Sequence, residues 1–292
     1  MEGASTFVRR RLEVSYTLGR DTFDGIRDTI NLSGLRMAAT ISKPGGFVQG
    51  NLQLRIFGLS LSDMLKMTVL GKGFLGVNKG NTITLRAGSG DGTSAATVYH
   101  GTVTNAWPDL EAQPDSSLAI VAFGAADVAM QSIPPSSYAG GVDVAVIMAD
   151  LAGKMNKRFE NAGVKVMLSN SYFPGSAYSQ AEAAAHAANI NMSIDDGVLV
   201  IWPKGGSREG LVPLISKDMG MIGYPTVSQI GIEIRTLFNP AVTFGAKVKV
   251  ESVLTPACGV WQVSQLEHTL ESETPDGAWF SRLSCVPLGY IS

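Results

Sequence analysis

Residues 98–107, with the sequence VYHGTVTNAW, begin the stretch that decides the fold of this chain. An acidic turn containing Pro114 and Asp115 follows, and then residues 118–123, LAIVAF. β-Branched and aromatic residues on both sides of a turn are typical of two antiparallel strands joined as a hairpin. The stretch therefore predicts a fold built mainly from β-strands.

A second stretch, near the C-terminus, is organised in the same way. Residues 261–271, WQVSQLEHTLE, lead to a turn with Pro275 and Asp276, and residues 279–286, WFSRLSCV, follow it. This stretch predicts a second hairpin of similar length, again with a Pro-Asp turn between its strands.

The spacing inside the two stretches is nearly equal. The interval from Val103 to Pro114 is one residue shorter than the interval from Val263 to Pro275. On similarity alone, two interpretations stay open: one β-unit carried twice, or two unrelated hairpins of an all-β protein. A chain that carries one unit twice can assemble as a ring with twice as many units as subunits.

The composition agrees with a large, turn-rich β protein. The 292 residues are 45% hydrophobic and only 16% charged, and they include 33 glycines, which suits two or three domains. The formal net charge of −2 argues against a dedicated nucleic-acid binder, which normally presents a basic face. No signal-peptide pattern and no apolar run long enough to span a membrane are expected.

The N-terminal third alternates between apolar and polar residues with the period of a strand. A short helix over residues 60–67 is expected to interrupt the strands, with Leu61, Met64 and Leu65 on its buried side. The alternating apolar positions are Leu12, Val14, Tyr16 and Leu18; Met37, Ala39 and Ile41; Leu52, Leu54 and Ile56; and Ile83, Leu85 and Ala87.

The pattern becomes mixed in the middle of the chain. Apolar spacing predicts a helix over residues 142–161, and Ser179 is expected to cap a second, alanine-rich helix. Asp196-Gly197 then predicts the turn of a hairpin with strands over residues 190–194 and 198–202. We therefore expect a mainly β, α+β protein in which two β-barrel or sandwich domains, residues 1–130 and 206–292, flank a small α/β domain, residues 134–205.

Motifs that would indicate enzymatic chemistry fail on context. Residues 71–76 match G-x-G-x-x-G, but they follow a short helix and lead into a strand, whereas a dinucleotide loop leads from a strand into a helix. The turn at residues 88–92 lacks the ligands of a calcium loop. The three histidines, His100, His186 and His268, have no metal-ligand spacing. No catalytic, cofactor-binding or metal-binding residue and no cofactor are predicted, and a non-enzyme is favoured.

Two cysteines, Cys258 and Cys285, lie in the last segment without a C-x-x-C pattern. They are interpreted as small core residues of a reducing compartment. Whether the two residues pair with each other stays open from the sequence.

The order of the segments and several local strings resemble the baseplate hub family of contractile phage tails, which is related to late control protein D and to the N-terminal part of type VI secretion spike proteins. The resemblance covers most of the chain. It is carried by residues 101–106 (GTVTNA), 114–115 (PD), 118–122 (LAIVA), 220–225 (GMIGYP), 231–235 (GIEIR), 237–240 (LFNP) and 279–287 (WFSRLSCVP).

The resemblance implies a structural role with several partners. In that family each subunit has two tail-tube-like β-barrels and an α/β insert, and three subunits present six similar barrels to the hexameric tail tube. The partners implied are a homotrimer, the tail tube protein, the central spike protein, other baseplate proteins and the tape measure protein. The implied location is the tail baseplate of the virion, after synthesis in the host cytoplasm. The type of tail, contractile or non-contractile, stays open.

The polar faces of the two predicted hairpins are candidates for the lining of a DNA channel. The residues proposed are Thr102, Thr104, Gln262 and Ser264. A channel without clustered cations would let DNA pass without specific binding, because bound phosphates hold DNA through counterion release.

Two alternatives from other functional classes are kept. One is a peptidoglycan- or carbohydrate-active tail protein in which Asp109 and Glu111 form the acid/base pair. The other is a sugar-binding module, which requires Trp107, Trp202 and Trp279 to meet on one exposed face.

Overall fold

The structure is a computed structural model that describes residues 9–44, 48–70, 80–89, 95–111 and 114–290. It divides into two compact units. Unit 1 contains Met1–Thr40, Leu52–Ala122 and Thr269–Trp279, and unit 2 contains Ile41–Asn51, Phe123–His268 and Phe280–Ser292. The predicted mainly β content with antiparallel pairing is confirmed, whereas the three domains expected at residues 1–130, 134–205 and 206–292 stay a prediction.

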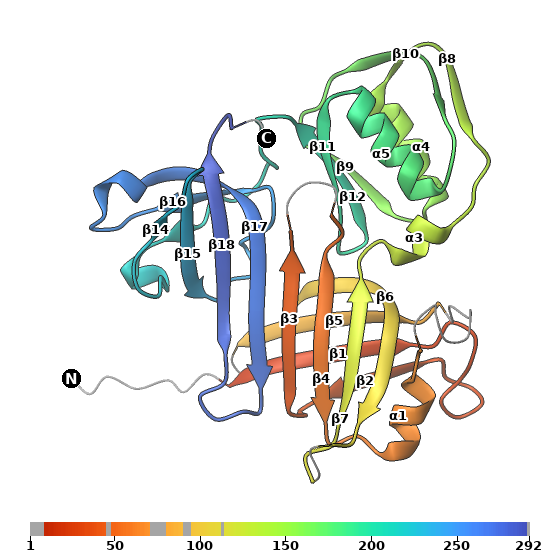
Figure 1. Cartoon of the computed structure of the whole chain (residues 1–292), viewed down its shortest axis with the longest axis vertical. Helices are drawn as coiled ribbons and strands as arrows, with labels where there is room; N and C mark the ends of the chain where they lie inside the picture. The colour runs from red at the N-terminus through yellow and green to blue at the C-terminus, as the bar shows by residue number, and fades with distance from the viewer. Residues whose placement is uncertain (1–8, 45–47, 71–79, 90–94, 112–113, 291–292) are drawn as a thin grey trace. The chain divides into compact units, whose positions relative to one another are not determined.

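Unit 1 is built around one antiparallel array (Figure 1). Within it the strands pair in the order β17-β3-β4-β7-β6-β5-β1-β2. Its elements are β1 (Arg10–Thr17), β2 (Thr29–Ser33), β3 (Met37–Lys43), β4 (Asn51–Phe57), α1 (Leu61–Met67), β5 (Thr82–Ser89), β6 (Ala96–Asp109) and β7 (Ser117–Phe123), with the end of β17 (Gly259–Ser272).

The predicted alternation of unit 1 is confirmed strand by strand. Leu12, Val14 and Tyr16 are fully buried along β1, and the residues between them are half-buried. The predicted apolar positions of β3, β4 and β5 are buried in the same way. One face of the array therefore forms the core of the unit, as the period of two requires.

Helix α1 occupies the predicted span but buries only part of the predicted side. Ser60 caps it, and its hydroxyl accepts a hydrogen bond from the N–H of Asp63. Met64 is buried as predicted, and Met67 is buried with it, whereas the prediction was wrong for Leu61 and Leu65, which are exposed. The end of the helix contacts β1, because the Tyr16 hydroxyl donates to the Met67 carbonyl over 2.8 Å.

Unit 2 combines an α/β part with strands that follow it. Its elements are α3 (Ala126–Met130), β8 (Ser136–Asp143), α4 (Val144–Lys154), β9 (Arg158–Asn161), β10 (Met167–Phe173), α5 (Ala177–Ala187), β11 (Ile190–Asp195), β12 (Val198–Pro203), β13 (Leu214–Ile215), η1 (Lys217–Met219), β14 (Thr226–Val227), β15 (Ile232–Leu237), β16 (Lys247–Val250), η2 (Thr255–Ala257), most of β17 and β18 (Trp279–Pro287).

Helices α4 and α5 lie side by side against strands of the α/β part (Figure 1). Val144, Ile147, Met148 and Leu151 form the buried stripe of α4, and its N-cap is Asp143. The expected helix over residues 142–161 is shorter, because Asn156 takes a left-handed φ of 52° and the chain then enters β9.

Two further local predictions for the α/β part can be judged. Helix α5 is capped by Ser176 and not by Ser179, because the Ser176 hydroxyl accepts from the Ser179 N–H over 3.3 Å. The β11–β12 hairpin is confirmed. Asp196 and Gly197 form its two-residue turn with φ of 49° and 80°, which is the geometry that an Asp-Gly pair adopts most readily.

The remaining strands of unit 2 pair in the order β14-β15-β18-β17, and β16 pairs with β17 and with β13. Among the described strands neither unit closes into a barrel, so the barrel form of the prediction was wrong. The physical reason is that β17 already has β3 on one edge and β18 on the other. Strand β2 therefore finds no free edge there to close on.

A buried hydroxyl of unit 1 offers a test of this packing. The Asn81 side-chain amide donates to the Tyr16 hydroxyl over 3.0 Å, and burial raises the pKa of Tyr16 to about 12. We expect Tyr16→Phe to lower the free energy of unfolding by about 1–3 kcal/mol, because it leaves a buried amide donor without its acceptor. Urea denaturation measures this change. The matched substitution Tyr172→Phe at an exposed tyrosine is expected to change it by less than about 0.5 kcal/mol. Equal effects would contradict the buried network.

Candidate functional site

The two predicted hairpins are present, and their first strands have equal length. β6 and β17 each contain 14 residues, and β7 and β18 return beside them. β6 also pairs with β5, and β17 also pairs with β16, so each long strand has a preceding and a following neighbour in the sequence. Both hairpins therefore lie in arrays with the same local strand order.

The contacts around the middle of the two long strands are equivalent. Val103 and Val263 are both fully buried. The N–H of Val103 donates to the carbonyl of Asn81, directly before β5, and the N–H of Val263 donates to the carbonyl of Ala246, directly before β16; both distances are 2.9 Å. The two valines thus hold the same place in their hairpins.

The residues that follow these valines, Thr104 and Ser264, also make equivalent hydrogen bonds. The Thr104 hydroxyl donates to the Val121 carbonyl over 3.2 Å, and the Ser264 hydroxyl donates to the Ser284 carbonyl over 3.0 Å. Each bond crosses from the long strand to the returning strand of its own hairpin. Unrelated hairpins share a strand period, but they have no reason to share both bonds at matched positions.

The four predicted channel residues lie on these strands. Thr104 and Ser264 are half-buried, whereas Thr102 and Gln262 are buried within their units. The Gln262 amide donates to the Gly206 carbonyl over 2.6 Å. The lining of a channel by these residues stays a prediction.

The strongest electrostatic feature is a buried ion network in unit 2. The Lys43 ammonium lies 2.5 Å from one oxygen of Asp195 and 3.2 Å from Asp196, and the Arg208 guanidinium lies 3.1 Å from the other oxygen of Asp195. The side chains of Lys43 and Asp195 are each 10% exposed. Sequence analysis missed this network, because its members come from segments far apart in the chain and carry no motif.

Pairing outweighs burial at both ends of the central ion pair. Burial alone would lower the pKa of Lys43, but the carboxylates of Asp195 and Asp196 raise it. Burial alone would raise the pKa of Asp195, but Lys43 and Arg208 lower it. Both groups are therefore charged near neutral pH, and the network ties the end of β3 to the turn of the β11–β12 hairpin.

His268 of β17 lies close to this network and is held neutral. Its Nδ1 shares a hydrogen bond of 2.7 Å with the hydroxyl of Ser281 on β18, and its ring packs edge-on against Phe238. Burial lowers the pKa of His268 to about 3, and the positive charge of Lys43 acts in the same direction. The carboxylate of Asp195 opposes this shift. Its role is that of a packed core histidine.

The exposed faces of the sheets carry two shallow hollows. In unit 1, a hollow of about 310 Å³ is floored by small residues, among them Ala38, Thr40 and Ala119, with Trp107 and Arg55 beside it. In unit 2, a hollow of about 370 Å³ includes Arg235 and Arg282. These two arginines face each other across β15 and β18, and the Arg235 guanidinium lies 3.8 Å from the centre of the Phe280 ring.

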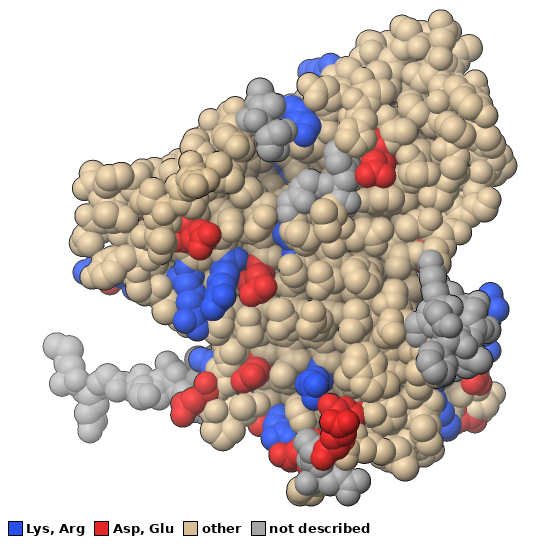
Figure 2. Space-filling model, viewed as in Figure 1, with Lys and Arg blue, Asp and Glu red and all other residues tan. Residues whose placement is uncertain are grey.

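The hollow of unit 2 carries charges of both signs, among them Glu233 and Glu267 beside its arginines, whereas the described lining of the hollow of unit 1 has only Arg55 and Glu271. Figure 2 shows that uncharged residues cover most of one face of the molecule and that its acidic and basic side chains form small mixed groups. Such a surface suits packing against other protein surfaces better than the binding of a polyanion.

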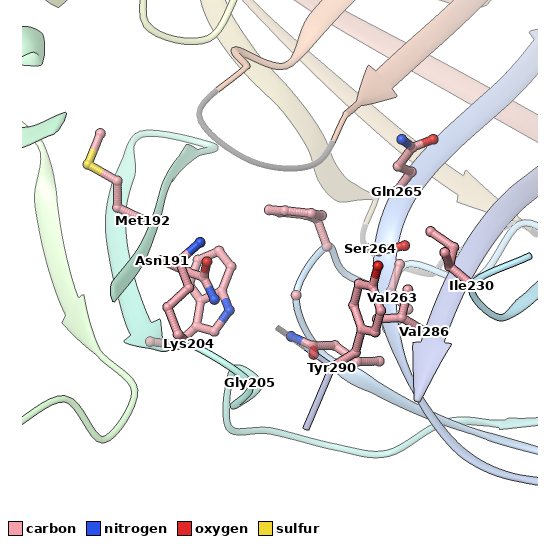
Figure 3. A pocket seen from close by; sticks show the side chains of 14 residues that line it. Asn191, Met192, Lys204, Gly205, Ile230, Val263, Ser264, Gln265, Val286 and Tyr290 are labelled. Atoms are coloured by element: carbon pink, nitrogen blue, oxygen red, sulfur yellow. The ribbon is translucent and has the colours of Figure 1, made fainter. Parts of the chain in front are cut away.

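A third hollow, in unit 2, is lined by apolar and uncharged polar residues together with one lysine. It measures about 300 Å³, and Figure 3 shows Asn191 and Lys204 on one side of it and Ser264, Val286 and Tyr290 on the other. Trp202, Phe244 and Val263 complete its apolar wall. No acidic residue is among the described residues that line it.

The features that an enzyme or a sugar-binding site would need do not converge. Asp109 is bound through one oxygen to Arg55 over 2.8 Å, and its other oxygen accepts from the N–H of Glu111. Of the three tryptophans that a sugar site requires, Trp107 is exposed, whereas Trp202 and Trp279 are buried.

The remaining sequence motifs can be placed as follows. The G-x-G-x-x-G loop at residues 71–76 lies outside the described residues, as does part of the turn at 88–92. The described residues contain no cluster of His, Cys, Asp and Glu that could hold a metal ion. The two cysteines are free thiols, and the prediction of core residues is confirmed for the buried Cys285 and wrong for the exposed Cys258. Burial raises the pKa of Cys285 to about 12. None of the described helices has the length and apolar character needed to cross a bilayer.

Comparison with known proteins gives one family and several similar folds. The family model for Baseplate hub gp41 matches residues 12–280. A tail protein from Neisseria meningitidis superposes with a TM-score of 0.61 at 11% identity, over 94% of this chain and 96% of that chain. A 43 kDa tail protein of prophage MuSo2 from Shewanella oneidensis gives 0.60 at 11% identity, over 95% and 99%.

A third structure comes from a secretion system. A component of the E. coli type VI secretion system, described as structurally similar to the phage T4 tail proteins gp27 and gp5, gives a TM-score of 0.57 at 10% identity, over 88% of this chain and 76% of that chain. At such identities these likenesses show the fold alone. No curated protein sequence matches the chain significantly.

The ion network predicts a large effect of removing one partner. We expect Lys43→Met to lower the free energy of unfolding by about 3 kcal/mol, because the buried Asp195 loses its nearest cation. The exposed pair Arg27–Asp24 supplies the control: Arg27→Met is expected to cost less than about 1 kcal/mol. Denaturant melts measure both, and a small loss for Lys43→Met would mean that Arg208 alone satisfies the buried carboxylate.

The neutral His268 predicts a pH dependence of stability. Its pKa in the folded chain lies below its ordinary value of 6.5, so as the pH falls below 6.5 the unfolded chain takes up a proton that the folded chain refuses. This residue alone should lower the free energy of unfolding by about 2 kcal/mol between pH 7 and pH 5. Denaturant melts at the two pH values measure this loss. It should be absent in His268→Gln and present in His186→Gln, a substitution at an exposed position on α5. The same slope in all three proteins would refute the assignment.

Proposed function

The chain belongs to the Baseplate hub gp41 family of structural proteins of the phage tail, and we propose that three copies form the hub between a hexameric tail tube and a trimeric central spike. The protein is accordingly a component of the virion. The trimer, the match between its threefold symmetry and the sixfold tube, and the DNA channel are the parts that we propose beyond the family assignment. It assigns the protein a mechanical role without catalysis.

The observation that carries the proposal is the repeat in the two hairpins. The buried valines Val103 and Val263 and the hydroxyl bonds of Thr104 and Ser264 occupy matched positions in strands of equal length. Two such tail-tube-like arrays in each of three chains supply six similar surfaces, which is what a sixfold tube requires from a threefold ring.

The repeat need not be a closed barrel to serve this purpose. The described array of unit 1 ends at β2, and β14 ends the strand order in unit 2. An end strand carries backbone N–H and C=O groups on its outer side that a neighbouring chain can pair with. We propose that pairing between neighbouring chains closes the ring, so that closure belongs to the assembly.

The channel through the ring is proposed to be lined by polar strand residues, including Thr102, Thr104, Gln262 and Ser264. Of these, Thr104 and Ser264 have side chains that are partly accessible in the single chain. The low charge of the protein supports passage of DNA without specific binding, because a lining without clustered cations releases few counterions from the phosphates. The other proposed partners are baseplate proteins and the tape measure protein, with assembly in the host cytoplasm.

The assembly state tests the proposal. The chain has a mass of 30.8 kDa, so mass photometry of the protein with its own phage's tube and spike proteins is expected to show a hub of three chains, about 92 kDa, or larger complexes containing it. A chain that stays monomeric with both partners present would refute the trimer. Threefold averaging of such complexes by cryo-electron microscopy should then reveal six similar sheets facing the tube.

The alternative of a peptidoglycan- or carbohydrate-active protein makes a different prediction for the same sample. Cell-wall zymography would show clearing by the wild-type chain and none by Glu111→Gln. No clearing by either protein would remove that alternative and leave the structural role.

A further inference from the structure

The pocket of unit 2 between β12 and β17 contains an unsatisfied hydrogen-bond donor. Trp202 is 3% exposed, and its indole N–H finds no acceptor among the described residues. A buried donor without a partner costs about 1–3 kcal/mol, which is why nearly all such groups are paired. Trp202 lines the pocket of about 300 Å³, so the unpaired donor belongs to a side chain of the pocket wall.

The charge of the pocket indicates what kind of acceptor fits. Lys204 is the only charged residue among its described lining residues, and no described ion pair involves it. The Asn191 amide donates one N–H to the Pro203 carbonyl, and the Gln262 amide donates one N–H to the Gly206 carbonyl. A carboxylate would answer both the indole N–H and the ammonium, since both are donors and no acid opposes it.

The rest of the wall is apolar and shaped by a glycine. Phe244 packs edge-on against Trp202, with ring centres 5.7 Å apart, and Val263 and Val286 line the pocket opposite. Gly245 has a φ of 79°, and a Cβ there would lie 3.1 Å from the Trp202 ring. The Gly245 backbone therefore lies close against the Trp202 ring and the Arg208 side chain, and a larger residue there would push on both.

The size of the pocket distinguishes a chain end from a continuous strand. A volume of about 300 Å³ is at the lower limit for ligand pockets and accommodates one or two residues. Capture of a terminal carboxylate is one of the recurring modes of peptide recognition.

We propose that this pocket binds the C-terminal residue of a partner polypeptide, with its carboxylate at Trp202 and Lys204 and an apolar last side chain against Phe244 and Val286. The inference goes beyond the hub function and does not depend on the trimer, because every residue that it uses belongs to unit 2 of a single chain.

The test follows the Trp202 indole signal by ¹⁵N NMR, assigned as the one absent from Trp202→Phe. The probe is an acetylated Gly-Gly-Ala-Leu peptide with a free C-terminal carboxylate, and its C-terminal amide is the matched control. We expect the free acid to move the Trp202 signal. The amide should bind at least about tenfold more weakly, because it loses one charge-assisted hydrogen bond. No movement of the signal with the free acid would overturn the proposal.

Two further experiments test whether Lys204 binds the carboxylate and whether the carboxylate must be that of a chain end. Lys204→Met should weaken the free acid about tenfold, whereas Lys217→Met, at an exposed lysine of η1 outside the pocket, should leave its affinity unchanged. An amidated peptide with an internal glutamate, acetylated Ala-Glu-Leu-Ala, is expected to bind no better than the amide control. Equal effects of the two lysine variants, or binding of the internal glutamate as tight as that of the free acid, would overturn the assignment to a chain end.

Discussion

Backbone pairing of the two 14-residue strands is the constraint on which the rest of the structure depends. Every N–H and C=O of a long buried strand needs a partner, so β6 and β17 each require a neighbour on both edges. β5 and β7 supply the neighbours of β6, and β16, β18 and β3 supply those of β17. The same demand explains why neither described array closes as a barrel: the edge of β17 that a barrel would use is already occupied.

The buried ion network solves a different problem. Asp195 lies at the end of β11, beside a turn whose backbone fixes where its carboxylate can go. A lone buried carboxylate would be far too costly, and two cations from distant segments, Lys43 and Arg208, repay the cost. Replacing such a network by apolar residues is often neutral for stability, so its value here is in fixing which segments meet. His268 stays neutral beside it because burial, and secondarily the positive charge of Lys43, lowers its pKa.

The sequence could predict those features of the structure that depend on residues close together in the chain. The alternation of Leu12, Val14 and Tyr16 and the Asp196-Gly197 turn depend on near neighbours, and the structure confirms both. The buried side of α1 was predicted only in part, because Leu61 and Leu65 are as apolar as Met64, and only the position of Tyr16 selects the methionine face. The pocket at Trp202 and the Lys43 network bring together residues distant in sequence without a motif, so periodicity contains no signal for them. The family resemblance rests on local strings, which lie on the two hairpins and on the segment over residues 220–240.

The two hairpins agree in backbone contacts and differ in side chains, and this difference bears on how a duplicated chain can work. Thr104 and Ser264 make the same bond, yet three residues further on β6 has the exposed Trp107 while β17 has the half-buried Glu267. Contacts made through the backbone are then alike around a ring, because strand pairing does not depend on side-chain identity. Contacts made through side chains alternate between two kinds. In the proposed ring, a sixfold partner would be held by the repeated backbone pattern, while a threefold partner would recognise the features that occur once per chain. The pocket at Trp202 is one such feature, since unit 1 has no described counterpart of it.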